Sequence, residues 1–238
     1  MALDRFILVL GSGPGIGVGV ATCFAEKGFN KVALLSRNAE RLKEDATAVS
    51  KAAPSAEVKT YTADLADSTG LKAVLSAIEA ENGRPEVVVY NASHLTMSKL
   101  GEYSEAEIET DLKISTVSLY TTATWALPLL VSLSADPSRK PSLLVTSGGL
   151  YRYPRPGYFS LALSKAAQHN LTMSMHQEYA SKGVHVAAVP VVGRVSPESE
   201  HFSPKRIAGV FWDLYQQGAE KGAKEAWVTT PEHEMAGK

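Results

Sequence analysis

Short apolar runs alternate with longer mixed segments along almost the whole chain. The strand candidates fall at 6–10, 32–36, 57–62, 87–90, 142–146, 184–189 and 226–229. Several of them are nearly continuous Val, Leu and Ile, which is typical of strands buried on both faces of a parallel sheet. Segments with helical periodicity lie near 15–28, 38–52, 67–82, 104–133, 157–182 and 203–218. The alternation predicts a doubly wound α/β fold.

No internal repeat, low-complexity tract or long linker interrupts this pattern. We therefore expect residues 1–238 to form one domain. Its first half, about 1–90, begins with a glycine-rich motif and is expected to hold a cofactor. The second half, about 91–238, is expected to carry the reactive groups.

Composition and charge narrow the class of protein. A chain of 238 residues with 45% hydrophobic and 21% charged residues is typical of a soluble globular domain. The net charge of −1 does not favour nucleic acid or an anionic membrane as a partner. A single cysteine, Cys23, excludes a disulfide framework and a cysteine metal site, and no other metal-ligand pattern stands out. Because the run 6–10 is also too short for a signal or membrane segment, we expect a cytoplasmic protein.

A glycine-rich turn joins the first predicted strand to the first predicted helix. Small residues there let the backbone approach a pyrophosphate, and the helix N-terminus offers free N–H groups and a positive dipole. An ordinary glycine-rich turn is the alternative, but the strand and helix on either side favour a dinucleotide site. The predicted cofactor-binding residues of the turn are Gly11, Ser12, Gly13, Pro14, Gly15, Ile16 and Gly17.

Ser36, Arg37 and Asn38 follow the second strand, at a position that distinguishes NAD from NADP. An acidic residue there binds the ribose 2′-hydroxyl, whereas an arginine accommodates a 2′-phosphate. Arg37 therefore favours NADP(H) over NAD(H), the alternative being a solvated arginine at a strand end. Asp64 and Leu65 close the third strand. The Asp64 carboxylate is a candidate both for the adenine amino group and for the N-cap of the next helix.

Asn91, Ala92 and Ser93 end the fourth strand, at the sheet edge where doubly wound folds bind ligands. The Asn91 side chain can bond the backbone across the turn. His94 follows at the expected mouth of the cleft. Its imidazole is a candidate acid or base, although an ordinary surface-loop histidine is the simpler interpretation.

These motifs together resemble those of the short-chain dehydrogenase/reductase family, in order and nearly in spacing, over roughly residues 5–195. The resemblance implies a Rossmann domain with a seven-stranded parallel sheet and a bound nicotinamide cofactor. It also implies a homodimer or homotetramer built on the long helices. The motifs that carry it are the glycine turn, Asp64-Leu65, Asn91-Ala92-Ser93, Ser147 and Ser164-Lys165-Ala166-Ala167.

The catalytic residues are where the chain departs from the family. Members usually carry an Asn–Ser–Tyr–Lys tetrad, and the resemblance assigns Ser147 to its serine and Lys165 to its lysine. Ser115 stands at the asparagine position. Leu161 stands four residues before Lys165, where the tyrosine belongs, and its side chain can neither donate nor accept a proton. The chain is thus similar to an atypical member with an altered proton relay.

Tyr158 is a candidate substitute for the missing tyrosine. Seven residues of helix turn through about 700°, so Tyr158 and Lys165 would share a face within roughly 20° if the helix were regular there. Tyr151 and Tyr153 in the preceding loop are further candidates. Each of the three tyrosines is alternatively a packing aromatic with a hydrated hydroxyl.

The segment after the sixth strand also departs from the family. By resemblance, the Val195 backbone would meet the nicotinamide amide, and Ser196 takes the place of a threonine that often bonds it. Only residues 197–202 separate this segment from the next helix, so we expect a short lid and an open cleft. Arg194 would face that cleft, either as a binder of an anionic substrate or in a surface salt bridge.

The leading functional hypothesis is an NADP-dependent oxidoreductase acting on a small carbonyl or alcohol compound or an activated double bond. Ser147 would polarise the substrate, Lys165 would fix the ribose, and Tyr158 or an ordered water would deliver the proton. Two alternatives remain open. One is a catalytically silent NADP-binding sensor or partner subunit, and the other is the same scaffold used for a non-redox cyclisation or isomerisation.

Overall fold

The computed structural model describes residues 4–230, and a parallel sheet lies at its centre. In chain order the strands are β1 (Phe6–Leu10), β2 (Lys31–Ser36), β3 (Glu57–Thr62), β4 (Val87–Tyr90), β5 (Ser142–Gly148) and β6 (His185–Val191). Their spatial order is β3-β2-β1-β4-β5-β6, and every neighbouring pair is parallel. The order therefore reverses between β1 and β4, which leaves a crevice at the carboxyl ends of these two strands.

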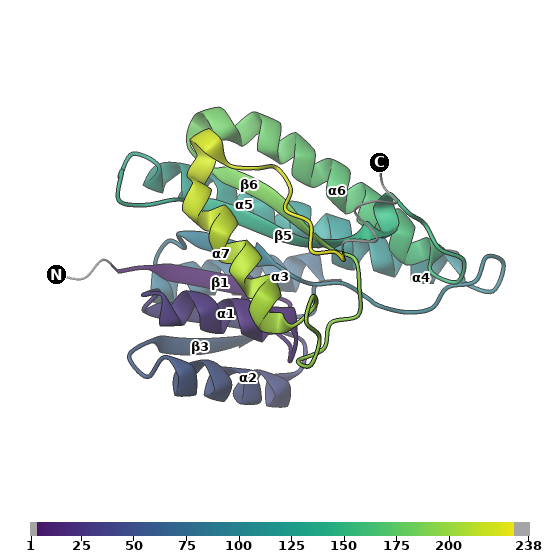
Figure 1. Cartoon of the computed structure of the whole chain (residues 1–238), viewed down its shortest axis with the longest axis horizontal. Helices are drawn as coiled ribbons and strands as arrows, with labels where there is room; N and C mark the ends of the chain where they lie inside the picture. Colours follow the sequence, from purple (N-terminus) through teal and green to yellow (C-terminus); the bar gives the residue numbers. More distant parts are fainter. Residues whose placement is uncertain (1–3, 231–238) are drawn as a thin grey trace.

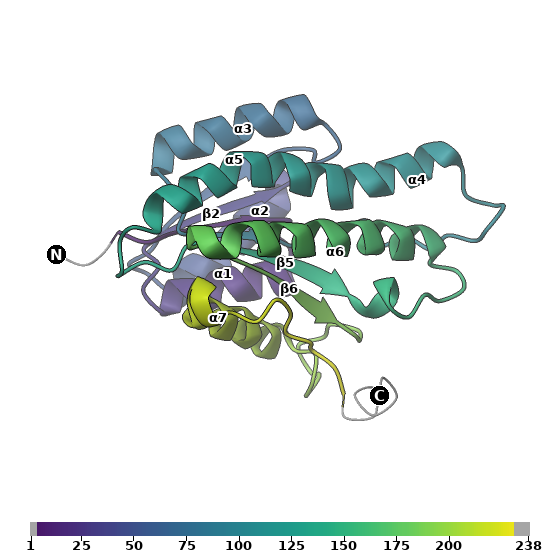
Figure 2. The same cartoon turned by 90° about the horizontal axis from the view of Figure 1, so that it is seen from above.

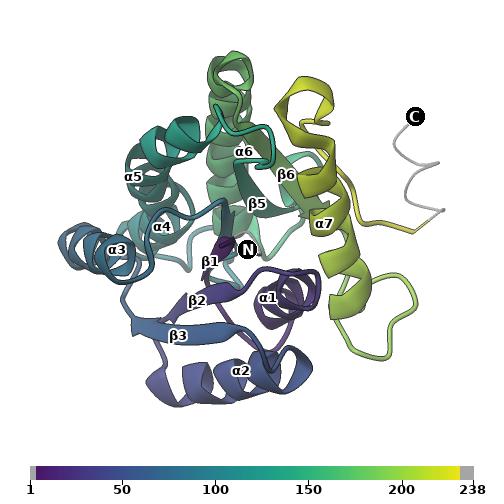
Figure 3. The same cartoon turned by 90° about the vertical axis from the view of Figure 1, so that its left-hand side faces the viewer.

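Helices cover both faces of the sheet (Figure 1). One face carries α1 (Ile16–Glu26), α2 (Ala39–Ala52) and α7 (Pro204–Lys221). The other carries α3 (Ser68–Asn82), the row formed by α4 (Glu105–Leu112) and α5 (Ser118–Leu133), and α6 (Phe159–Tyr179). The end-on view of Figure 3 separates the three layers, and Figure 2 shows α3, α5 and α6 side by side. The predicted Rossmann-like α/β fold is confirmed.

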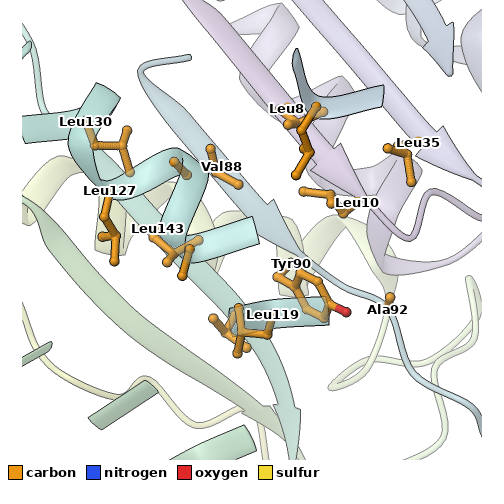
Figure 4. Packing of buried hydrophobic residues seen from close by; sticks show 14 of the residues in the cluster. Leu8, Leu10, Leu35, Val88, Tyr90, Ala92, Leu119, Leu127, Leu130 and Leu143 are labelled. Carbon is orange, nitrogen blue, oxygen red and sulfur yellow. The ribbon is translucent and has the colours of Figure 1, made fainter. Parts of the chain in front are cut away.

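Alternate side chains of β1 enter two separate hydrophobic cores, one on each face of the sheet. Ile7 and Val9 pack with α1 and α7, whereas Leu8 and Leu10 point to the opposite face, and all four are buried. Both faces of the strand are therefore apolar, as its continuous hydrophobic sequence indicated. Figure 4 shows the second core, in which Leu8, Leu10, Val88 and Tyr90 of the sheet face Leu119, Leu127 and Leu130 of α5.

The expected seventh strand at 226–229 is wrong, because the sheet has six strands. This segment lies along β6 and makes only isolated contacts with it. The Ala226 amide donates to the Ala188 carbonyl (3.0 Å), and the Val228 amide donates to the Pro190 carbonyl (2.9 Å). Between these two bonds a regular ladder needs an N–H at position 190, which proline lacks. Pro190 thus breaks the pairing that the apolar sequence predicted.

The long helix predicted at 104–133 is interrupted at its centre. A π-helical turn, Lys113–Val117, joins α4 to α5 and contains Ser115. Such turns are frequent at functional sites. By length and composition Glu105–Leu133 could cross a membrane, but 56% of its most apolar window is buried inside the protein. That burial is typical of a core helix.

Candidate active site

The glycine turn fills the crevice between β1 and β4. Gly11 has φ of +85°, and a Cβ at this position would lie 2.6 Å from the Ala92 nitrogen. A Cβ at Gly17 would lie 2.9 Å from the Gly11 carbonyl oxygen. Around Gly13, by contrast, no described atom lies within 4 Å of such a Cβ. Gly11 and Gly17 therefore let the turn close on the sheet, and Gly13 leaves open space in which a ligand can approach the backbone.

Side-chain hydrogen bonds tie this turn to three neighbouring elements. The Ser12 hydroxyl donates to Asp45 Oδ2 on α2 (2.7 Å), and both groups are buried. The Asn91 amide at the end of β4 donates to the Gly11 carbonyl (2.8 Å). Thr146 of β5 donates in turn to Asn91 Oδ1 (2.7 Å). Contacts from α2, β4 and β5 thus hold the turn in place without a ligand.

Asp45 is a site residue that the sequence did not reveal. Burial raises the pKa of its carboxyl group, while the hydrogen bond from Ser12 and the nearby Arg41 guanidinium oppose that rise. The Arg41 Nε lies 3.9 Å from Asp45 Oδ1. In the sequence this aspartate resembles any acidic residue on a solvated helix, and only the packing of α2 against the turn distinguishes it.

A first cleft, about 620 Å³ in volume, opens beside the turn. Arg37 lies exposed in its lining and has no hydrogen bond or ion pair with the residues that the structure describes. Its neighbours are engaged, since the Asn38 side chain caps α2 by accepting from the Arg41 amide (3.0 Å) and Arg41 pairs with Glu44 (2.9 Å). Predicted cofactor residues in the lining are Gly11, Ser12, Gly13, Pro14, Ser36, Arg37, Asn38, Asp64, Leu65, Asn91, Ala92 and Ser93.

The two alternatives for Asp64 are now distinguished. The N-cap of α3 is Asp67, whose carboxylate accepts from the Thr69 amide (3.0 Å). Asp64 instead accepts from the Ala66 amide (2.9 Å) and lies in the lining of the first cleft. The helix-cap interpretation of Asp64 is therefore wrong, and its carboxylate is placed where a ligand can reach it.

A second cleft, about 800 Å³ in volume, continues from the first and shares Asn91 and Ser93 with it. The structure brings most of the predicted reactive residues together here. Predicted site residues in its lining are Gly15, Ile16, Asn91, Ser93, Ser147, Tyr158, Lys165 and Val195. Leu161 lies in the same lining, whereas Gly17 and Ser115 lie in neither cleft.

Lys165 is buried at the base of this second cleft. Its ammonium group donates to the Thr146 carbonyl (3.2 Å) and to Gln168 Oε1 (2.9 Å). Burial lowers the pKa of Lys165 to about 8. The amide nitrogen of Gln168 donates to the main-chain carbonyl of Ser115 (2.9 Å), so Gln168 links the lysine to the π-helical turn. The sequence reasoning missed Gln168, although its position three residues after Lys165 places both on one helix face.

Two buried hydroxyls near Lys165 lack partners. The Oγ atoms of Ser147 and Ser115 have no hydrogen-bond partner within residues 4–230. A buried polar atom without a partner costs free energy that a bound polar group can recover. Ser147 also lines the second cleft at the end of β5, so its hydroxyl is suited to bind a ligand oxygen. Ser115 contributes through its backbone carbonyl instead.

His94 is held outside the clefts. Its Nδ1 lies 2.6 Å from Asp111 Oδ1, and its Nε2 lies 2.9 Å from Thr96 Oγ1. Asp111 is buried and also accepts from Tyr103 (3.0 Å) and Ser160 (2.5 Å). These bonds brace the 91–103 loop against α4 and α6, so a structural role fits His94 better than acid–base chemistry. Among the described residues, no group of three or more His, Cys, Asp or Glu could hold a metal ion.

The sequence matches a known protein family over most of its length. The family model for short chain dehydrogenases matches residues 5–201. The chain belongs to this family. Short-chain dehydrogenases are NAD(P)-dependent oxidoreductases, and the two connected clefts beside the glycine turn suit an elongated dinucleotide such as NAD(P). The open space at Gly13 and the unpartnered Ser147 hydroxyl fit such a ligand.

Several proteins are similar to this short-chain dehydrogenase. An uncharacterized oxidoreductase of Staphylococcus aureus strain USA300 is 26% identical over 193 residues, covering 78% of this chain and 76% of the relative. The oxidoreductase UcpA of Salmonella typhimurium is 26% identical over 210 residues, covering 84% of this chain and 76% of UcpA. An alcohol dehydrogenase of Thermococcus sibiricus, solved with 5-hydroxy-NADP, has a TM-score of 0.83 at 18% identity. The match covers 96% of this chain and 99% of the archaeal chain. A metagenomic short-chain oxidoreductase solved with NADP has a TM-score of 0.80 at 21% identity, covering 96% and 98%. These two structural matches show the fold.

In this short-chain dehydrogenase a leucine lies four residues before the buried lysine. Leu161 is 4% exposed and adds an apolar side chain to the second cleft. Tyr158 shares the cleft, but α6 begins at Phe159 and Tyr158 has the non-helical angles φ −138° and ψ 29°. The shared face of Tyr158 and Lys165 required a regular helix from Tyr158 onward, and that condition is not met because Tyr158 lies one residue before the helix.

The two loop tyrosines, Tyr151 and Tyr153, lie in different surroundings. Tyr153 also lines the second cleft. Tyr151 is turned away from it, because its ring stacks on His169 (3.9 Å between centroids) and its hydroxyl donates to Glu225 (2.7 Å). Tyr151 is thus excluded as a group in the cleft.

Proposed function

We propose that this short-chain dehydrogenase uses NADP(H) in preference to NAD(H) and acts on a small carbonyl or alcohol compound or an activated double bond. One observation carries the proposal. Two clefts that share Asn91 and Ser93 run from an unpaired cation, Arg37, to a buried lysine and an unpartnered hydroxyl, Lys165 and Ser147. The arrangement suits a phosphorylated dinucleotide at one end and a polar substrate atom at the other.

The chain supplies a different binding group in each part of the two connected clefts. Free backbone N–H groups of the turn would bind the pyrophosphate, and Arg37 would supply charge for a 2′-phosphate. The Lys165 ammonium is held by Thr146 and Gln168 and offers a donor to ribose hydroxyls. Ser147 donates to the substrate oxygen. When bound, the nicotinamide ring supplies or accepts the hydride.

The proton must follow an altered route, because Leu161 carries no ionisable group. Tyr158 lines the same cleft as Ser147, so its hydroxyl or an ordered water is the proposed donor. General acid catalysis typically contributes about 10²–10⁴-fold in rate. A modest turnover is therefore expected even with a correctly placed cofactor.

The cofactor preference is tested by equilibrium binding of NADPH and NADH, followed by tryptophan fluorescence. NADPH should bind at least about tenfold more tightly, since a guanidinium–phosphate contact contributes roughly 1.5–3 kcal/mol. The Arg37→Ala variant should lose that difference without weaker NADH binding. Arg206→Ala, an exposed arginine outside both clefts, serves as the control. Equal affinities for the two cofactors in the wild-type protein would overturn the NADP preference.

Turnover is tested by following NADPH consumption with a panel of aldehydes, ketones and enones. In the Tyr158→Phe variant the rate should fall by about 10²-fold or more if the tyrosine hydroxyl delivers the proton. An unchanged rate would remove Tyr158 from the mechanism and leave water as the donor.

The apolar wall at Leu161 favours a second candidate, a catalytically silent NADP-binding sensor or partner subunit. That role predicts tight NADPH binding with no turnover across the panel. A non-redox cyclisation or isomerisation would instead proceed in protein freed of cofactor. The two assays therefore separate the reductase from the silent binder, and product formation by cofactor-free protein would identify the third function.

We also propose that the protein is a cytoplasmic homodimer or homotetramer with a small-molecule substrate and no nucleic-acid or membrane partner. Val117, Tyr120 and Leu163 support the assembly, since they are exposed apolar side chains on the adjoining π turn, α5 and α6. A hydrogen bond from Thr116 to the Ser164 carbonyl (3.3 Å) joins these elements. Light scattering should give a multiple of the chain mass, and Leu163→Asp should reduce it to the monomer.

A further inference from the structure

The second cleft has an unbalanced charge. Its lining contains three cationic residues, Lys165, Arg155 and Arg194, but no aspartate or glutamate. Lys165 is buried and already donates to Thr146 and Gln168. Both arginines are exposed, so their guanidinium groups are the charges that a solvent-borne ligand meets first.

These two arginines have no partners of their own. Neither guanidinium makes a hydrogen bond or ion pair in the part of the chain that the structure describes, whereas Arg41, for example, pairs with a glutamate. Arg155 lies in the connection after β5, and Arg194 lies in the connection after β6. Since β5 and β6 are adjacent, with Gly148 opposite Val191 at their ends, both connections leave the sheet at the same edge.

The remainder of the cleft wall is mainly apolar. Leu95 is 78% exposed and Tyr153 is 40% exposed, so both present apolar surface to the open cleft. Both belong to the cleft lining, as do Leu150, Leu161 and Val192. A ligand with an apolar body would cover them.

We propose that the substrate is an oxo acid: an apolar chain or ring that carries a carbonyl group and, some carbons away, a carboxylate. Arg155 and Arg194 bind the carboxylate, because a guanidinium offers a planar pair of donors that matches two carboxylate oxygens. The apolar wall covers the chain. The part assigned to the carbonyl, at Ser147, rests on the proposed oxidoreductase function.

Binding is tested without hydride transfer, using octanoate and octanamide as probes on protein loaded with NADP⁺. Octanoate should bind at least about tenfold more tightly than the uncharged octanamide in isothermal titration. Arg155→Gln and Arg194→Gln should each weaken octanoate binding by about fivefold and leave octanamide binding unchanged. The control Arg206→Gln should change neither. Octyl phosphate distinguishes a carboxylate site from a general anion site.

Equal binding of octanoate and octanamide would overturn the proposal. An Arg194→Gln variant with weaker NADPH binding and unaltered octanoate binding would assign that arginine to the cofactor, and would overturn its role here. Turnover separates this proposal from the proposed function. If 4-oxooctanoate and 2-octanone are reduced with equal kcat/KM, the carboxylate site is wrong and the reductase stands. If octanoate binds through the arginines but no ketone is reduced, the site stands and the reductase is wrong.

Discussion

The two ends of the cleft differ in how most of their polar groups are satisfied; the exception is the Ser36 hydroxyl, which lies in the first cleft and has no partner within the described residues. Beside the glycine turn, the Ser12 hydroxyl is bonded to Asp45 and the Asn91 amide is bonded to Gly11. Beside Lys165, the hydroxyls of Ser147 and Ser115 are equally buried but have no partner among residues 4–230.

This difference separates a preformed region from one that a ligand completes. The bonded groups around the turn stabilise the protein itself, so the turn needs no reorganisation on binding. An unpartnered buried hydroxyl destabilises the folded protein, and that free energy is recovered only when a ligand supplies a polar atom. Cofactor binding should therefore depend on residues that also support stability, and turnover on residues that do not.

Gly11→Ala should show the largest loss, because it breaks the preformed region. The new Cβ would lie 2.6 Å from the Ala92 nitrogen at a φ of +85°, so the free energy of unfolding should fall by about 4 kcal/mol and cofactor binding should be lost. Urea unfolding measures the change. Gly13→Ala is the matched control, and it should keep its stability within about 0.5 kcal/mol while weakening NADPH binding. Equal stabilities of the two variants would contradict the structure of the turn.

Lys165 makes the stability of the reactive region depend on pH. Its pKa is lowered from 10.5 to about 8 in the folded protein. At Lys165 the folded state thus binds fewer protons than the unfolded state between these values, and the contribution of this lysine to the free energy of unfolding should rise with pH across that window. The rise is roughly 3 kcal/mol at most. Below pH 8 the buried lysine is charged, and its full destabilising effect on the folded protein is present. Lys165→Met should abolish it in urea titrations at successive pH values, so parallel curves for the two proteins would refute the assignment.

Ser147→Ala should reduce turnover without reducing stability. No hydrogen bond within the described chain is lost and an unsatisfied buried hydroxyl is removed, so the free energy of unfolding should not fall. Removing the donor to the substrate oxygen should lower kcat/KM by about 100-fold. Ser174→Ala, on an exposed part of α6, should change neither quantity. A drop in stability with unchanged kcat/KM would show that Ser147 is a structural group.

Local patterns were enough to predict most of the fold. Continuous apolar runs identified the inner strands, because a strand buried on both faces leaves that signature in the sequence alone, whereas the edge strand β3 is half-exposed and alternates polar with apolar residues. The seventh strand was wrong for a non-local reason. The missing N–H of Pro190 matters only once the segment at 226–229 lies beside it, and periodicity carries no information about which strands meet.

The candidate site divides in the same way. Arg37, Ser147 and Lys165 were found from position and resemblance, and the structure places each in a cleft lining. Asp45 and Gln168 were missed because their roles depend on partners distant in the chain, Ser12 and the Ser115 carbonyl. Helical periodicity assigns such residues to a face but does not identify the group that they meet.

Ser12→Ala should have a small effect on stability, and it tests directly whether the hydroxyls at the two ends of the cleft differ. Its hydroxyl donates to the buried Asp45 carboxylate (2.7 Å), so the substitution leaves an acceptor unsatisfied. The free energy of unfolding should fall by about 1–2 kcal/mol, whereas Ser147→Ala costs nothing. Adding Asp45→Ala to Ser12→Ala should recover part of the loss, with a coupling energy of about 1 kcal/mol in a double-mutant cycle. If the two serine variants unfold at the same urea concentration, the hydroxyls do not differ as their partners indicate, and the division into a preformed and a ligand-completed region fails.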